Sequence, residues 1–195
     1  MNGRMAQVVL DTDFIVGILE YESGDPVDLF RRVFQDLGYA PVVHSYLVRN
    51  ELLLYEGKVR TLLEEGTLTS ISLECLGGVD DEYGRELYRN NFVDMHKQFN
   101  YEALPEETDI FASRANGSFG EIHSILLATE LGIPLLYSND GGTKIAARYF
   151  AEGRLTVENA MEVAERLMGS TLILPQERKF IHNYYKRRDP RKQHT

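Results

Sequence analysis

The chain has 195 residues, 43% apolar and 26% charged, with a formal net charge of −9 and one cysteine. This composition is typical of one globular α/β domain, and one cysteine excludes an internal disulfide and a cysteine-rich zinc site. The negative charge argues against a protein that coats itself in nucleic acid. No apolar run reaches the roughly 20 residues of a membrane-spanning helix, and the first residues lack the apolar segment of a signal peptide. We therefore expect a cytoplasmic protein with no membrane partner.

Positive charge is concentrated near the end of the sequence. Residues 176–195 carry a local balance of +5, so residues 1–175 carry −14. A basic tail on an acidic body is suited to contact a polyanion locally, although a solvated chain end has the same composition.

The first strong pattern is QVVLDTDFI at residues 7–15. Its apolar run, VVL, predicts a short strand buried on both faces, as in parallel sheets. Asp11 follows this strand directly, at the position where open α/β sheets bind ligands. Apolar residues resume at once, so a helix is expected to begin at Thr12 or Asp13. Asp13 is then either the cap of this helix or a second functional carboxylate.

A second informative carboxylate lies in the next predicted unit. Residues 27–37 predict a helix, opened by a proline and stopped by a glycine. Residues 41–43 predict a strand, after which Ser45 is expected to cap a helix over residues 46–56. On a helical wheel, Glu51 lies within the apolar arc of that helix. A carboxylate on a buried face is costly unless it is paired or bound to a cation, so Glu51 needs an arginine or a metal ion.

The middle of the chain is expected to be mostly helical. We predict a strand over residues 67–73 and helices over residues 58–65, 80–101 and 105–114. The apolar residues of the segment 80–101 recur at helical spacing and are expected to be core.

Residues 118–131, SFGEIHSILLATEL, predict a helix with another inward carboxylate. Ser118 and Glu121 fit a capping box, which is the structural alternative for Glu121. On the helical wheel, Glu121 projects onto the arc opposite His123 and Glu130, which mark the polar side. We therefore expect Glu121 to face inward and His123 to be solvated.

A further carboxylate follows a later strand. Residues 135–137 predict a short buried strand that ends in Ser138-Asn139-Asp140. Asp140 thus lies just past the carboxyl end of a strand, as Asp11 does. Its structural alternative is to cap the following helix.

Three closing helices are expected over residues 144–150, 155–168 and 176–187. In the first of them, Lys144 and Arg148 lie one turn apart and face either a phosphate or solvent. The sequence contains no internal repeat and no low-complexity linker. It predicts one domain, with a core from about residue 7 to 150 and a helical C-terminal extension over about 151–195.

The four carboxylates have a common chemical interpretation. Asp11 and Asp140 end strands, and Glu51 and Glu121 lie on helices expected to pack near those ends. If they converge, hard cations must offset their repulsion. Oxygen ligands without cysteine or paired histidines select Mg²⁺ or Mn²⁺. Such sites commonly hydrolyse phosphodiesters, because the metal lowers the pKa of bound water and stabilises charge on the phosphate.

The order and spacing of these residues resemble the PIN-domain ribonuclease family. The resemblance rests on Asp11 after the first strand, Glu51 after the second and the S-x-D of residues 138–140. The pair Gly120-Glu121 before ILLA resembles a subset of that family in which a Gly-Glu pair opens the helix. The resemblance covers roughly residues 8–150. It implies a three-layer α/β/α fold with a mostly parallel sheet, and a metal-dependent nuclease acting on RNA.

The resemblance also implies roles for individual residues. The catalytic residues and ligands of Mg²⁺ or Mn²⁺ would be Asp11, Glu51, Glu121 and Asp140. Ser138 would help to shape the site, and Asp13 is an additional candidate. Many family members have an aspartate where Glu121 stands, so Asp109 is an alternative to it. Many members are the toxin of a toxin–antitoxin pair, so RNA and an antitoxin protein are expected partners. A homodimer is a separate expectation.

A haloacid-dehalogenase-like phosphatase is an alternative function. Residues 10–15 match its D-x-D signature, with Asp11 as nucleophile, Asp13 as acid and Lys144 as the lysine of that family. The later strand ending in paired acidic residues is missing. This alternative also leaves the two helical carboxylates unexplained.

A non-catalytic member of the same fold that binds RNA or a protein is the other alternative. It predicts that each carboxylate has a structural partner, such as Arg49, Arg114 or Arg148.

Overall fold

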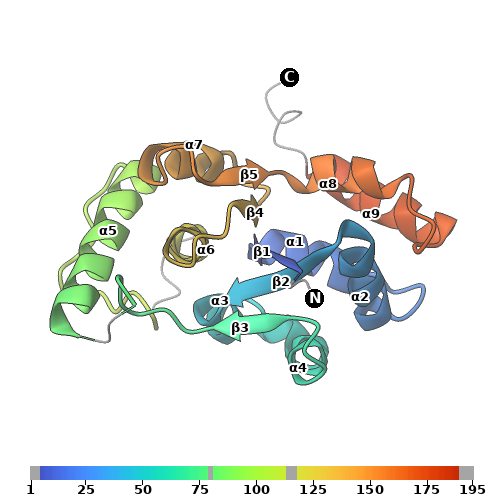
Figure 1. Ribbon diagram of the computed structural model, residues 1–195, viewed down its shortest axis with the longest axis horizontal. Helices are drawn as coiled ribbons and strands as arrows, with labels where there is room; N and C mark the ends of the chain where they lie inside the picture. Colours follow the sequence, from blue (N-terminus) through green and yellow to red (C-terminus); the bar gives the residue numbers. More distant parts are fainter. Residues whose placement is uncertain (1–4, 79–80, 113–117, 189–195) are drawn as a thin grey trace.

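The computed structural model describes residues 5–78, 81–112 and 118–188. Within these ranges, five strands form one parallel sheet in the order β3-β2-β1-β4-β5. The strands are β1 (Ala6–Leu10), β2 (Tyr39–His44), β3 (Thr69–Ile71), β4 (Leu135–Tyr137) and β5 (Thr156–Glu158). Helices cover both faces of the sheet (Figure 1), so the predicted three-layer α/β/α sandwich is confirmed.

The two faces of the sheet are covered by different parts of the chain. The helices are α1 (Thr12–Leu19), α2 (Pro26–Leu37), α3 (Ser45–Asn50), α4 (Glu56–Glu64), α5 (Glu82–Asn100), α6 (Phe119–Glu130), α7 (Gly141–Phe150), α8 (Ala160–Leu167) and α9 (Pro175–Arg187). In Figure 1, α1, α2, α8 and α9 lie on one side of the sheet and α6 on the other, with α5 packed outside α6. None of the helices in the described ranges is long and apolar enough to cross a membrane.

Local sequence explains the first elements. Val8, Val9 and Leu10 are completely buried in β1, the central strand, which pairs with β2 on one edge and β4 on the other. Asp25 caps α2, and Gly38 ends it in the left-handed conformation, with φ of 73°. This conformation carries little steric penalty for glycine. The predictions for this part of the chain are confirmed.

Helix α6 is buried on all sides, because the sheet covers one face and α5 the other. The prediction that His123 is solvated is therefore wrong. His123 is completely buried, with Nε2 2.9 Å from the Ile110 carbonyl oxygen and Nδ1 2.5 Å from the Tyr88 hydroxyl. Since a carbonyl oxygen only accepts, Nε2 carries the proton and Nδ1 accepts from Tyr88. Burial also lowers the pKa of His123, which keeps the ring neutral.

Some predicted elements have different limits. The helix expected over residues 46–56 is divided into α3, a 3₁₀ turn at Leu53–Tyr55 and the start of α4. The amides of Glu51 and Leu52 both donate to the Leu47 carbonyl at 2.9 Å, and the second of these bonds, which spans five residues instead of four, ends the regular pattern of α3. His44, not Ser45, caps α3 by accepting from the Tyr46 amide at 3.0 Å.

Two further predictions are wrong. The helix expected over residues 105–114 is replaced by turns over the described residues 105–112. The helix expected over residues 155–168 begins with β5, which pairs with β4 and joins the sheet. The region expected to be a helical C-terminal extension contains α8 and α9 and also supplies the fifth strand.

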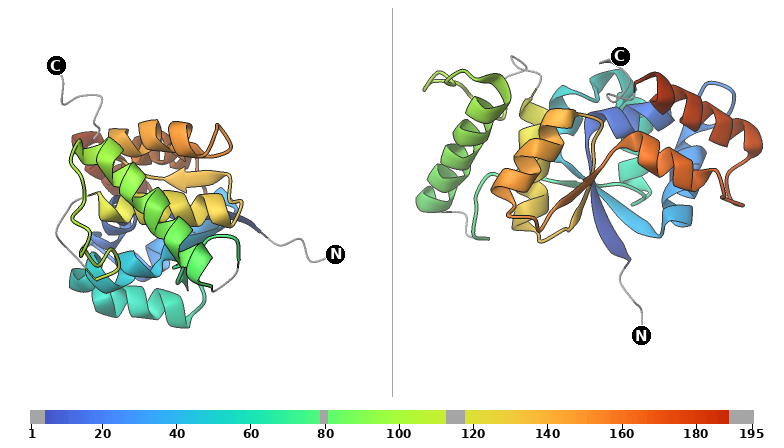
Figure 2. Two further views of the ribbon diagram at one scale, coloured as in Figure 1. Left: turned by 90° about the vertical axis from the view of Figure 1, so that its left-hand side faces the viewer. Right: turned by 90° about the horizontal axis from the view of Figure 1, so that it is seen from above.

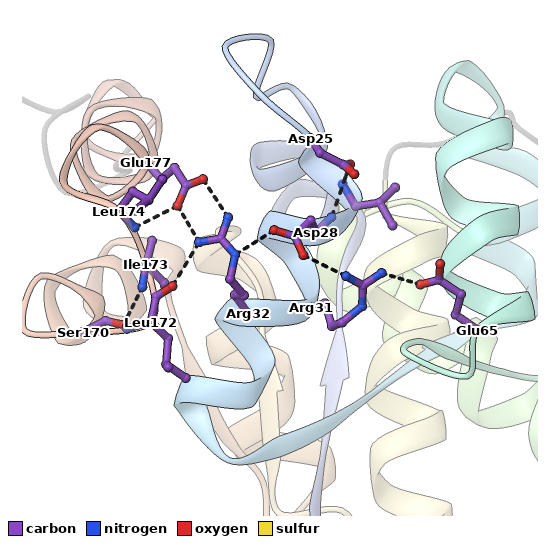
Figure 3. Close-up of polar contacts among 11 residues, drawn as sticks. Asp25, Asp28, Arg31, Arg32, Glu65, Ser170, Leu172, Ile173, Leu174 and Glu177 are labelled. Carbon is purple, nitrogen blue, oxygen red and sulfur yellow. Dashed lines mark hydrogen bonds and ion pairs between the residues drawn. The ribbon is translucent and has the colours of Figure 1, made fainter.

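The C-terminal helices are attached to α2 by an ion-pair network (Figure 3). Arg32 donates to both carboxylate oxygens of Glu177 at 2.7 Å and to the Leu172 carbonyl at 3.0 Å. On the same helix, Arg31 pairs with Asp28 and with Glu65 of the segment after α4. The network fixes the start of α9 beside α2. From there α9 runs past α1, so that its C-terminal end lies on the side of the sheet away from the start of β1 (Figure 2).

Candidate acidic site

The carboxyl ends of β1 and β4 lie at the topological switch point of the sheet. From β1 the chain proceeds to β2 and β3 on one side, and it later forms β4 and β5 on the other. Open α/β sheets bind ligands in the crevice at this point. Asp11 follows β1, and Ser138 and Asp140 follow β4, so both strand-end carboxylates lie at the expected edge.

Asp11 is the most buried of the predicted carboxylates, with 4% of its surface exposed. Its Oδ1 accepts from the Thr12 amide at 2.8 Å, and its Oδ2 accepts from the Ser138 hydroxyl at 2.7 Å. Burial raises the pKa of the Asp11 carboxyl to about 7, and the negative charges of Glu51 and Asp13 add to this shift. The predicted role of Ser138 in shaping the site corresponds to this direct hydrogen bond.

Glu51 lies at the C-terminal end of α3 and points toward α1 and α6. The Thr12 hydroxyl donates to its Oε2. A Cβ atom added at Gly120 would lie 2.4 Å from its Oε1, so glycine at this position leaves the space that the carboxylate occupies. Burial raises the pKa of Glu51, with a further contribution from the charge of Asp13.

Glu121 faces inward, as the helical wheel predicts. The capping box expected with Ser118 is not formed: Ser118 makes no side-chain cap, and its hydroxyl accepts from Asn100 at 2.7 Å. Glu121 Oε2 is buried without a hydrogen-bond partner. Burial raises the pKa of Glu121 to about 10, and the charges of Asp11, Glu51 and Asp140 contribute.

Asp140 and Asp13 lie at the exposed margin. Asp140 caps α7, accepting from the amides of Gly142 at 3.1 Å and Thr143 at 3.3 Å. Partial burial raises the pKa of Asp13, and the charge of Asp140 adds to this, whereas Arg188 at the end of α9 opposes it. We refer to five residues together as the acidic site: Asp11, Asp13, Glu51, Glu121 and Asp140.

Three other predicted residues lie elsewhere. Asp109 is exposed and accepts from the amides of Phe111 and Ala112, which fixes a local turn. Lys144 and Arg148 line a groove of about 730 Å³ between α7, β5 and α8, whose walls also carry acidic residues of α8. The structure therefore brings Glu121, rather than Asp109, into electrostatic contact with Asp11.

The chemistry of the acidic site fits a hard divalent cation. All its ligand atoms are carboxylate oxygens, which Mg²⁺ and Mn²⁺ prefer, and Glu121 offers a buried oxygen without a partner. As the side chains are placed, no group of three or more acidic, histidine or cysteine residues in the described ranges is close enough to hold a metal ion. Asp11, Glu51 and Asp140 are instead engaged in hydrogen bonds to the protein. Cation binding thus requires some of these carboxylates to rotate away from their partners.

Two residues of the site were not predicted from the sequence. Thr12 positions Glu51 through its hydroxyl, and Gly120 provides the space for that carboxylate. The only sequence signals are the place of Thr12 between two aspartates and the place of Gly120 before Glu121.

Comparisons with protein-family models, with curated proteins and with solved structures returned no match. The fold and the geometry of the acidic site are therefore the features that bear on function. Together they define an α/β protein whose carboxylates gather at the switch point of a parallel sheet.

Proposed function

We propose that this protein is a Mg²⁺- or Mn²⁺-dependent ribonuclease that hydrolyses RNA phosphodiester bonds at the acidic site. One observation carries the proposal: Asp11 is buried, Glu51 and Glu121 are half-buried, and these three carboxylates from separate elements repel one another. In the described parts of the chain, none of the ion pairs involves these three residues. Such an arrangement destabilises the protein alone, and a divalent cation offsets it.

The proposed cation ligands are Asp11, Glu51, Glu121 and Asp140. When bound there, Mg²⁺ or Mn²⁺ lowers the pKa of a water molecule and stabilises negative charge on the phosphate. The hydroxyls of Ser138 and Thr12 orient Asp11 and Glu51. The α6 backbone at Gly120 sets how closely the Glu51 carboxylate approaches that helix.

The two alternative functions use fewer of these features. A phosphatase with Asp11 as nucleophile and Asp13 as acid gives no role to the buried Glu121 oxygen. A non-catalytic binding module needs basic partners for the carboxylates, but Arg49 pairs with Glu74 at 3.8 Å and Arg148 lines a different groove. Arg114, the third predicted partner, lies outside the described residues. The antitoxin prediction depends on the family resemblance alone, and the homodimer stays a prediction.

The test is Mn²⁺-dependent cleavage of labelled single-stranded RNA, beside hydrolysis of p-nitrophenyl phosphate. Asp11→Asn and Glu51→Gln are expected to reduce RNA cleavage about 100-fold or more. Asp94→Asn removes an exposed carboxylate on α5 and serves as the matched control. Normal RNA cleavage by Asp11→Asn contradicts the proposal. Phosphatase activity that survives Glu51→Gln supports the dehalogenase-like alternative instead.

A further inference from the structure

The end of α5 packs against α7 (Figure 1). A second cleft, more apolar than the groove beside β5, lies between these two helices. Its volume is about 170 Å³, and four aromatic side chains line it: Phe99, Tyr101, Tyr149 and Phe150. Tyr101 and Tyr149 are 91% and 74% exposed, so their rings are not used in the core. Among the described residues, the lining holds no charged side chain.

The aromatic cleft lies beside Asp140, at the margin of the acidic site. A Cβ atom added at Gly142 would lie 2.9 Å from the Phe99 ring and 3.0 Å from the Asp140 carboxylate. Gly142 is therefore in contact with both regions. The hydrogen bond from Asn100 to Ser118 also fixes the end of α5 beside the first turn of α6, which carries Glu121.

The backbone at Tyr101 indicates that its ring is not required for folding. Tyr101 ends α5 in the left-handed conformation, with φ of 57°. That region is unfavourable for an L-residue, and glycine is the usual residue at such helix ends. Because the ring is exposed, it gains almost no burial in return. Folding alone favours glycine at this position.

We propose that the aromatic cleft binds one unpaired base of a single-stranded RNA whose phosphodiester backbone lies across the acidic site. This inference rests on the proposed function and adds the form of RNA that the site takes. Aromatic side chains stack on exposed bases, and sequence-tolerant stacking is common in single-strand binding. Gln98 adds an amide that both donates to and accepts from a base edge.

The size and charge of the cleft favour this occupant over others. Ligand pockets usually measure roughly 300–1,000 Å³, so a cleft of about 170 Å³ suits one planar ring system better than a segment of a partner protein. Its uncharged lining suits a neutral base rather than a phosphate. A base within a duplex is stacked on its neighbours and does not enter such a cleft without being flipped out.

The test measures RNA binding separately from cleavage. The probe is a short single-stranded RNA containing 2-aminopurine, whose fluorescence falls when the base stacks. It is titrated with protein carrying Asp11→Asn in Mg²⁺ buffer, so that the RNA stays intact. Adding Tyr101→Gly and Tyr149→Ala is expected to raise the dissociation constant about tenfold or more and to remove the quenching. Tyr101→Gly alone is expected to leave the melting temperature equal or higher, which excludes a folding defect.

Tyr83→Ala is the matched control, because Tyr83 lies on the same helix, is 73% exposed and does not line the cleft. It is expected to bind the probe as the parent protein does. Unchanged binding and quenching in the cleft variant overturn the base subsite. If the wild type cleaves RNA and Asp11→Asn does not, the nuclease proposal remains intact in that case. Absence of both binding and cleavage overturns both proposals. A change in oligomeric state with unchanged RNA binding assigns the cleft to a second copy and also overturns the inference.

Discussion

Glu177 and Glu121 occupy the same position, the third residue of a helix, and have opposite environments. Glu177 receives two hydrogen bonds from Arg32, and this pairing lowers the pKa of its carboxyl. Glu121 has a buried oxygen without a partner, and burial among other carboxylates raises its pKa to about 10. Helix position is the same in both, so the difference comes from the surroundings: Arg32 pairs with Glu177, whereas burial and other carboxylates act on Glu121.

The comparison separates two uses of a buried carboxylate. At Glu177 the charge is paired within the protein and attaches α9 to α2 (Figure 3). At the acidic site, Asp11 and Glu121 have no basic partner among the described residues. Their charges therefore destabilise the fold and remain available to an external cation. The Arg32–Glu177 pair thus stabilises the fold, and the acidic site is where the proposed chemistry takes place.

The largest expected effect comes from removing a charge of the acidic site. In metal-free buffer, the stability of Asp11→Asn relative to the wild type should rise by on the order of 2–4 kcal/mol from about pH 4 to about pH 8. The Asp11 pKa is about 7 in the folded protein and 3.8 as its ordinary value. Between these values the folded wild type binds more protons than the unfolded chain, so its stability falls as pH rises.

Urea unfolding of both proteins over this pH range measures the difference, and buried histidines such as His44 cancel because both proteins contain them. Added Mg²⁺ should reduce the advantage of the variant, since the cation binds the folded wild type. A pH-independent difference would mean that the Asp11 pKa is not raised.

The next effect comes from removing the arginine of the paired region. Arg32→Met is expected to lower the free energy of unfolding by about 3 kcal/mol, because it leaves the Glu177 carboxylate buried and unpaired. The Glu177 side chain is 6% exposed. Arg31→Met, one residue away, breaks pairs that are more than 40% exposed and should cost less than about 1 kcal/mol. Equal losses in urea unfolding would show that burial does not distinguish the two arginines.

The smallest effect tests how the acidic site is held. Gly120→Ala places a methyl group where the Glu51 carboxylate lies, so the carboxylate must move. Mn²⁺-dependent RNA cleavage is expected to fall about 10- to 100-fold, mainly through weaker Mn²⁺ dependence. Gly57→Ala is the control, because no atom lies within 4 Å of its added Cβ. An unchanged Mn²⁺ titration for Gly120→Ala would remove Glu51 from the proposed ligands.

The sequence predicts those elements whose signals are local. A buried apolar run predicts β1, and Pro26 and Gly38 delimit α2. The sequence pattern does not distinguish β5 from the helix that follows it, because these three residues form a strand only by pairing with β4. His123 was misplaced because a helical wheel describes one helix, whereas the solvent side of α6 is covered by α5.

Local sequence signals also predict part of the acidic site. Strand ends predict where Asp11 and Asp140 lie, and the helical wheel predicts that Glu121 faces inward. Hydrogen bonds between distant segments were not predictable, because Thr12 and Glu51 are 39 residues apart. The placement of Lys144 beside β5 depends equally on a strand that the sequence pattern concealed.

The strand order has a consequence for the nascent chain. β1 pairs with β2 soon after both are synthesised, but its other edge pairs with β4, where Val9 lies opposite Leu136. Contacts between such distant residues form slowly, and an unpaired strand edge promotes association with other chains. The central strand is thus synthesised first but is paired on both edges only after β4 is made, and a chain that stops before β4 leaves one edge of the apolar strand β1 unpaired.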